Sequence, residues 1–90
     1  MPSFRVFLSN KAEKGLRQVP PPFRQRIMNA VDDLIENPVP NQKYDVTKLT
    51  GSESNYRIRI GRYRILYCVK WNEKEIKVFD IDQKKDHTYD

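Results

Sequence analysis

The second half of the chain contains a run of alternating side chains, Tyr56-Arg57-Ile58-Arg59-Ile60-Gly61-Arg62-Tyr63-Arg64-Ile65-Leu66-Tyr67. Apolar and charged residues alternate on both sides of a central Gly-Arg pair, and this period of two is typical of half-buried strands. Glycine at the first central position is preferred in type II′ hairpin turns. The run therefore predicts a β-hairpin that turns at Gly61 and Arg62.

This register separates the apolar and the charged residues of the hairpin onto opposite faces of the sheet. The tyrosines and isoleucines share one face, which is expected to pack in the core. On the other face Arg59 is expected directly opposite Arg64, with Arg57 beside both. Like charges opposed across two strands destabilise a sheet, whereas guanidinium groups match the geometry of phosphate. We interpret this face as a site for a polyanion; the alternative is a solvated face whose arginine stems cover apolar surface.

The length and the charge of the chain limit what the protein can be. Its 90 residues predict a single domain spanning 1–90. The 17 Lys and Arg against 12 Asp and Glu give a formal net charge of +5, which favours a negatively charged partner. No apolar run is long enough to span a bilayer and no signal-peptide core is evident. We therefore expect a soluble, cytoplasmic protein that does not act at a membrane.

Cysteine and histidine are too few for the sites that they often form. A single cysteine, Cys68, excludes an internal disulfide and a cysteine-based zinc cluster. The one histidine, His87, lies near the C-terminus, so no dedicated metal site is expected. Cys68 itself is expected to be buried and reduced, because free cysteines are among the most buried residues. No small-molecule cofactor is indicated.

The residues before the hairpin predict one strand and two helices. Residues 3–8 alternate like a strand, and Phe7 on the second parity suggests that this strand is covered on both faces over part of its length. Ser9 or Asn10 then caps a helix. A triple proline at 20–22 ends this helix and starts a second, since proline is tolerated at a first helical position.

The remaining segments complete a small α+β domain. The second helix must end near Asn37, because Pro38 disfavours helical geometry in the residue before it. The chain then runs through an extended connector, a loop and a turn into the hairpin. Residues 75–81 form a last strand. We predict an N-terminal strand and a two-helix hairpin packed on one face of a mostly antiparallel four-stranded sheet.

This order of elements resembles the RelE/ParE superfamily of toxins from type II toxin–antitoxin pairs. The residues that carry the likeness are Lys48-Leu49-Thr50-Gly51, the run at 56–67, and the closing Lys84-Lys85 with Tyr89. The loop Val39-Pro40-Asn41-Gln42-Lys43-Tyr44-Asp45-Val46 is similar to the archaeal-type RelE branch.

The resemblance implies a metal-independent mRNA interferase, an endoribonuclease that acts on mRNA in the ribosomal A site and inhibits translation. In that branch the 2′-hydroxyl of the RNA attacks the adjacent phosphate, giving a 2′,3′-cyclic phosphate and a free 5′-hydroxyl. The implied partners are a cognate antitoxin, the ribosome with its rRNA, and mRNA. Preorganised guanidinium groups are suited to stabilise the charge that builds on the phosphoryl oxygens.

The resemblance also assigns roles to individual residues. The catalytic set carried over by position is Arg57, Arg59, Arg64, Lys84, Lys85 and Tyr89. Either late lysine fills one basic position, and the tyrosine stacks on the substrate base. The residues assigned to RNA binding are Lys48, Arg62 and His87. The general base stays open, because arginine is effectively never deprotonated; the candidates are Lys48, Lys84, Lys85, His87 and Tyr89.

Two other functions are compatible with the same pattern. A ParE-like toxin would share the fold and inhibit DNA gyrase without cleaving RNA, but that branch generally lacks the clustered basic face. A catalytically inactive RNA- or ribosome-binding module would keep the arginines for binding alone, and the late lysines, where the resemblance leads us to expect an arginine, leave room for it.

Overall fold

The computed structural model describes residues 3–83 and contains two helices and five strands. In chain order the elements are β1 (Arg5–Leu8), α1 (Asn10–Arg17), α2 (Pro21–Asp33), β2 (Asp45–Lys48), β3 (Asn55–Ile60), β4 (Tyr63–Lys70) and β5 (Glu75–Gln83). The predicted α+β class is confirmed. Neither helix in this part of the chain is long and apolar enough to cross a membrane.

The five strands form one sheet in the order β1-β5-β4-β3-β2. β1 runs parallel to β5, and all the other neighbours are antiparallel. The prediction of four strands was therefore one short, because it treated Asp45–Lys48 as part of a loop. β2 pairs with β3 over four residues, of which only Val46 is partly buried. So short and polar a strand has no hydrophobic alternation by which the sequence could reveal it.

The hairpin register is confirmed residue by residue. Ile58 pairs with Ile65, and Arg59 pairs with Arg64. Gly61 has φ +60°, a backbone conformation that costs a residue with a side chain. A Cβ at this position would also lie 2.7 Å from the Phe23 ring. The turn therefore needs glycine for its backbone and for its packing against α2.

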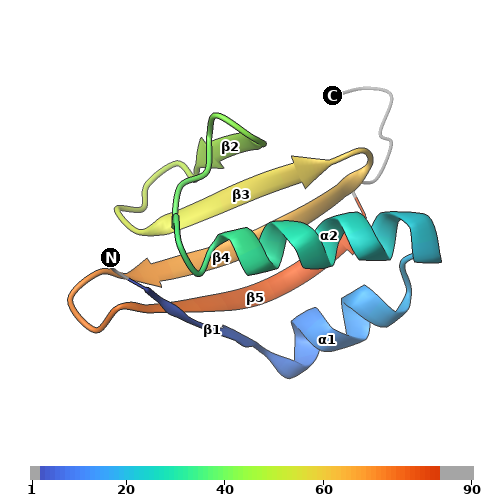
Figure 1. Cartoon of the computed structure of the whole chain (residues 1–90), viewed down its shortest axis with the longest axis horizontal. Helices are drawn as coiled ribbons and strands as arrows, with labels where there is room; N and C mark the ends of the chain where they lie inside the picture. The colour runs from blue at the N-terminus through green and yellow to red at the C-terminus, as the bar shows by residue number, and fades with distance from the viewer. Residues whose placement is uncertain (1–2, 84–90) are drawn as a thin grey trace.

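The core lies between α2 and the apolar face of the sheet, and Figure 1 shows α2 lying across that face. Its fully buried side chains on α2 and in the turn after it include Ile27, Ala30 and Leu34. The hairpin contributes Ile58 and Ile65, both with no exposed surface. Burying a side chain of this size contributes roughly 1.5–3 kcal/mol. This packing fixes which face of the sheet stays uncovered.

α1 lies along β5 beyond the end of β1 (Figure 1). Its N-cap is Ser9, whose Oγ accepts a hydrogen bond from the Ala12 N–H at 3.0 Å and donates one to the Phe79 carbonyl at 3.0 Å. At Gly15 the helix comes so close that a Cβ would lie 1.8 Å from the Ile81 carbonyl oxygen. The cap and the glycine together fix α1 against β5.

The other face of the sheet has no helix over it among the described residues. Phe7 lies on this face and is 48% exposed, so the prediction that the first strand is covered on both sides was wrong. Cys68 lies on the same face and is only half-buried, so full burial was also wrong. Parity alone could not show that both helices leave this face uncovered.

Candidate nucleic-acid interface

A row of four charged residues crosses the uncovered face of the sheet. Asp45 on β2 pairs with Arg59 on β3, which pairs with Arg64 on β4, which pairs with Asp82 on β5. The two opposed arginines therefore have an aspartate on each outer side. This arrangement offsets the repulsion of the like charges, and it does so without any bound polyanion.

Arg64 is firmly held at one end of this row. Its Nε donates to Asp82 Oδ1 at 2.9 Å and its Nη2 donates to Asp82 Oδ2 at 2.8 Å. This hydrogen bonding raises the pKa of Arg64 above its ordinary value, and the nearby Asp80 charge adds to the effect. Both partners are 31% exposed. The two-point contact fixes the orientation of the guanidinium plane.

Arg59 is held only loosely at the other end. Its Nε lies 3.6 Å from Asp45 Oδ2, an ion pair without a hydrogen bond. The two side chains are 46% and 56% exposed. Exposed pairs of this kind contribute little to stability. A phosphate oxygen can therefore displace this carboxylate at small cost.

Arg57 has no carboxylate partner among residues 3–83. Its Nη2 donates to Thr47 Oγ1 at a long 3.4 Å. Its Nε is buried and has no hydrogen-bond partner in the described part of the chain. An unsatisfied buried donor costs about 1–3 kcal/mol, and such groups in folded proteins call for an explanation. A ligand oxygen can reach this guanidinium at Nη2, whose contact with Thr47 is exposed.

The other predicted site residues fall into three groups. Arg62 is exposed in the hairpin turn. It lies next to the uncovered sheet face that carries Arg57, Arg59 and Arg64, which we call the arginine face. Lys48 pairs with Tyr56 and so shares the parity of the apolar face, and its Nζ lies 3.8 Å from Glu53 Oε1. The structure thus does not bring Lys48 onto the arginine face. Four predicted residues lie outside the described part of the chain: Lys84, Lys85, His87 and Tyr89.

Sequence reasoning missed the two aspartates of the row. Asp45 belongs to the strand that was not predicted, and Asp82 follows a register shift between β4 and β5 at Leu66 and Tyr67. The sequence signal that could have indicated these aspartates was an acidic residue in each of the two segments that flank the hairpin. Guanidinium groups bind a phosphate and neutralise its charge but cannot accept a proton, so the proton acceptors within this row are these two carboxylates.

No metal centre forms within the described residues, where no three His, Cys, Asp or Glu side chains gather. The anion-binding groups of the row and of Arg57 beside it are guanidinium groups. One is fixed, one is loosely paired, and one has an unpaired buried donor, all on two adjacent strands. This arrangement can bind a phosphodiester and stabilise negative charge that develops on it.

Comparison with known proteins supplies relatives over nearly the whole chain. Residues 6–87 match the family described as ParE toxin of type II toxin–antitoxin system, parDE. The chain is 32% identical over 82 residues to the putative toxin RelE1 of Methanocaldococcus jannaschii, covering 91% of each protein.

Solved structures show the same fold. The archaeal RelE–RelB complex from Pyrococcus horikoshii matches with a TM-score of 0.84 and 33% identity, covering 94% of this chain and 99% of that one. The isolated E. coli RelE toxin matches with a TM-score of 0.81 over 97% of this chain and 90% of that one. Its identity is only 18%, so that second likeness concerns the fold alone.

Proposed function

Because the chain belongs to the RelE/ParE superfamily of toxins from type II toxin–antitoxin systems, we propose that it is a ribosome-dependent endoribonuclease. It cleaves mRNA in the ribosomal A site and thereby inhibits translation. The observation that carries this proposal is Arg57, which has no carboxylate partner among residues 3–83 and lies beside two further arginines. The relatives that share about a third of its residues are named as RelE toxins, which supports the same reading.

The proposed reaction forms one bond and breaks one. The 2′-oxygen of a ribose attacks the adjacent phosphorus and loses its proton to a base, and the bond from phosphorus to the 5′-oxygen breaks. The leaving oxygen takes up a proton, so the products are a 2′,3′-cyclic phosphate and a 5′-hydroxyl. Bringing the attacking oxygen into line is a large part of such catalysis, and the ribosome would supply that alignment.

Each described arginine has its own role in this reaction. Arg57 donates to a non-bridging oxygen through Nη2, which has only the long, exposed contact with Thr47 and no carboxylate partner among residues 3–83. Arg59 exchanges its loose contact with Asp45 for the phosphate. Arg64, fixed by Asp82, stabilises the charge that develops in the transition state. None of these steps uses a metal ion.

The remaining roles fall to residues 84–90. Lys84 or Lys85 protonates or stabilises the leaving oxygen, and Tyr89 stacks on a base of the substrate, a contact that contributes roughly 1–3 kcal/mol in single-stranded complexes. His87 contacts RNA, as does Arg62 from the described part. Lys48 shares the parity of the apolar face, so any contact that it makes with RNA lies away from the arginine face. We further propose a cognate antitoxin that neutralises the protein, as the match to a RelE–RelB complex suggests.

The direct test is to incubate the purified protein with translating ribosomes and to map the ends of the mRNA. The proposal predicts new ends within codons, only when ribosomes are translating. Naked mRNA of the same sequence is the control and should stay intact. Uncut mRNA on translating ribosomes, from a preparation that still binds its antitoxin, would contradict the proposal.

A second function has one observation in its favour, since the matching family is described by the name ParE. A ParE-like toxin would inhibit DNA gyrase and leave mRNA unchanged. The same preparation added to gyrase and relaxed plasmid decides between the two. Gyrase-dependent DNA breaks with intact mRNA would favour this alternative. RNA binding that depends on Arg57, with neither activity, would instead indicate an inactive binding module.

A further inference from the structure

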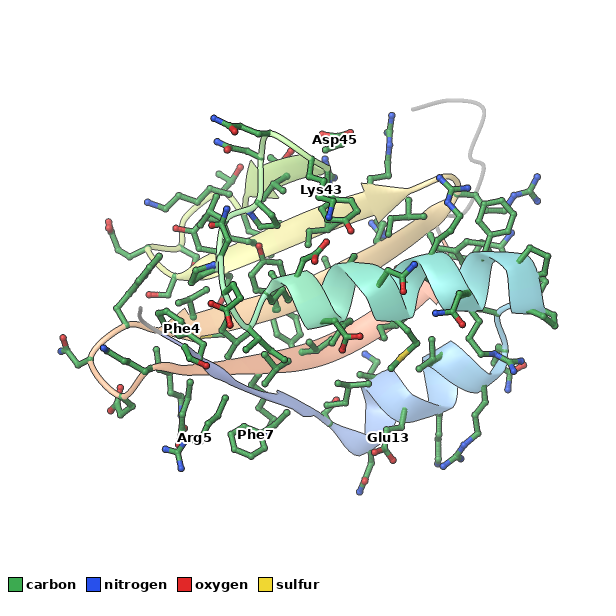
Figure 2. All side chains as sticks on the ribbon, viewed as in Figure 1. Phe4, Arg5, Phe7, Glu13, Lys43 and Asp45 are labelled. Carbon is green, nitrogen blue, oxygen red and sulfur yellow. The ribbon has the colours of Figure 1, made fainter. Side chains whose placement is uncertain are left out.

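A cleft opens at the edge of the sheet, where the arginine face meets the side of α2. It has a volume of about 270 Å³ and lies between α2 and the start of β2. The polar residues that line it are Arg26, Asn29, Lys43, Asp45 and Arg59. Figure 2 labels Lys43 in the loop before β2 and Asp45 at the start of β2. We call this feature the edge cleft.

The edge cleft carries a surplus of positive charge. Three cationic side chains line it: Lys43 is paired with Asp33 at 3.0 Å, Arg59 is loosely paired with Asp45, and Arg26 is the third. The Asp45 carboxylate is 3.6 Å from Arg59 and does not hydrogen-bond to it. Arg26 has no carboxylate partner among residues 3–83, and its guanidinium lies 5.2 Å from the centre of the Phe23 ring. Arg26 and the loosely paired Arg59 are thus available to an anion.

The walls of the cleft are held in place by neighbouring contacts. Lys43 lies 3.0 Å from Asp33, and the Tyr44 hydroxyl donates to the same carboxylate, which ties the loop before β2 to α2. On α2, Asn29 Oδ1 accepts from Gln25 Nε2 at 3.0 Å. The amide group of Asn29 therefore keeps its own donors for a ligand in the cleft.

We propose that the edge cleft binds a backbone phosphate of the single-stranded RNA whose scissile linkage lies on the arginine face. The identity of this ligand rests on the proposed function. Arg59 belongs to both places, so one strand can pass from the face around the sheet edge without leaving positive charge. Contacts of this kind position a nucleic acid and carry no sequence information.

An acidic peptide fits the edge cleft less well. A helical peptide docks through an apolar stripe and needs a hydrophobic groove. The only side chains of that kind in the cleft are Tyr44 and Ile60, of which Ile60 is 4% exposed. An extended peptide would need a free strand edge, but the free outer edge of β2 is only four residues long, and Asp45 is its one residue that lines the cleft. A phosphate needs only the cations and the amide.

The test is a binding titration with a 2′-O-methylated RNA dodecamer, which lacks the attacking hydroxyl and is not cleaved. Backbone amide signals are followed by two-dimensional NMR, and affinity is measured as a function of salt. The wild type should show shifted amides at Asn29 and Gly61 as well as along β3. The double variant Arg26→Gln/Lys43→Gln should bind several-fold more weakly, and its salt slope should fall by about 0.7 for each lost phosphate contact.

The matched control is Lys14→Gln/Arg17→Gln on α1. It removes the same two charges from exposed positions away from the cleft, and its salt slope should change less. Equal slopes in the two double variants, or RNA-induced shifts that spare Asn29 and Gly61, would overturn the inference. So would shifts at these amides caused by an acidic peptide and not by RNA.

A parallel cleavage assay on translating ribosomes separates this inference from the proposed function. If the wild type cleaves normally but Arg26→Gln/Lys43→Gln binds RNA with an unchanged salt slope, the edge-cleft inference alone is overturned. A reduced slope in that variant, with no cleavage by the wild type, supports the cleft as an RNA site and overturns the endonuclease proposal.

Discussion

Arg59 and Arg64 face each other across β3 and β4, and each has an aspartate as its other neighbour. The sequence correctly predicted the opposed arginines, because hairpin parity and turn type together fix the register. It did not predict the aspartates, because one lies on an unpredicted strand and the other lies beyond a register shift. The opposed charges are thus compensated within the chain, and the case for a polyanion now rests on Arg57.

Arg57→Gln tests separately how Arg57 affects the free energy of unfolding and how it affects the cleavage rate. The change removes a buried donor without a partner in the described chain, so the free energy of unfolding should stay within about 1 kcal/mol of the wild type or rise. The cleavage rate on ribosomes should fall by roughly 100-fold or more, as on loss of one preorganised donor. Urea denaturation and single-turnover cleavage measure the two quantities. A variant that cleaves like the wild type would contradict the role of Arg57.

Asp82→Asn tests whether Arg64 must be held in one orientation. Loss of the two-point ionic contact should lower the free energy of unfolding by about 1 kcal/mol. The cleavage rate should fall while RNA binding holds or tightens, because the face loses a negative charge. Asp80→Asn is the control: it removes the same charge from a residue whose ion pair is with Lys11 at 3.4 Å. If both variants lower the cleavage rate equally, charge rather than orientation is responsible.

The elements themselves were predicted to different degrees. Both helices and the hairpin carry clear periodicity and strong start and stop signals, so their existence followed from the sequence. β2 did not, because it is a short edge strand with one partly buried side chain. Gly15 is a further case, since glycine inside a helix only suggests a weak helix. Glycine is needed here because the Ile81 carbonyl packs against it, and Ile81 lies far away in the sequence.

Gly15→Ala tests the packing of α1 on β5. Helix propensity alone predicts a gain of about 1 kcal/mol for alanine. A Cβ 1.8 Å from the Ile81 carbonyl oxygen forces α1 away from the strand, and overpacking of this kind costs roughly 1–3 kcal/mol or more. The variant should therefore be less stable in urea denaturation. Lys14→Ala, at an exposed neighbouring position, should be neutral or slightly stabilising. Equal gains in both variants would contradict the packing.

The link between α2 and the loop before β2 should make stability depend on pH at both extremes. Hydrogen bonds from Tyr44 and Lys43 lower the pKa of Asp33 below its ordinary 3.8. A lowered carboxyl pKa adds stability that is present above that ordinary value and is lost as pH falls through the folded pKa. Burial and the Asp33 contact raise the pKa of Tyr44 from 10.0 to about 12. A raised tyrosine pKa adds stability that is full below 10.0 and is lost as pH rises through about 12.

Tyr44→Phe isolates these contributions. At neutral pH the variant should lose about 1 kcal/mol, because a hydrogen bond to a charged group is removed. Its alkaline decline should be smaller than that of the wild type, with Tyr67 still contributing, since burial raises the pKa of that residue too. Its acid decline should also shrink, leaving the share due to Lys43. The free energy of unfolding, measured across the pH range, checks both the acid and the alkaline decline. Identical pH profiles for the variant and the wild type would contradict the account.

At the scale of the whole molecule, one sheet face is buried by α2 and the other is left uncovered within residues 3–83. The uncovered face is the arginine face, and the edge cleft extends its positive charge to the space between β2 and α2. The net charge of +5 agrees with an anionic partner but does not say which surface meets it. That assignment needed the three-dimensional arrangement, because the residues involved come from α2, β2, β3, β4 and β5.

The chemistry of the RNA ends produced on translating ribosomes tests the central proposal most directly. We predict that wild-type protein yields downstream fragments with a free 5′-hydroxyl, which a polynucleotide kinase labels without prior phosphatase treatment, and upstream fragments ending in a 2′,3′-cyclic phosphate. Arg57→Gln should yield almost none of either. Fragments with 5′-phosphates, or equal yields from the wild type and the variant, would contradict the account.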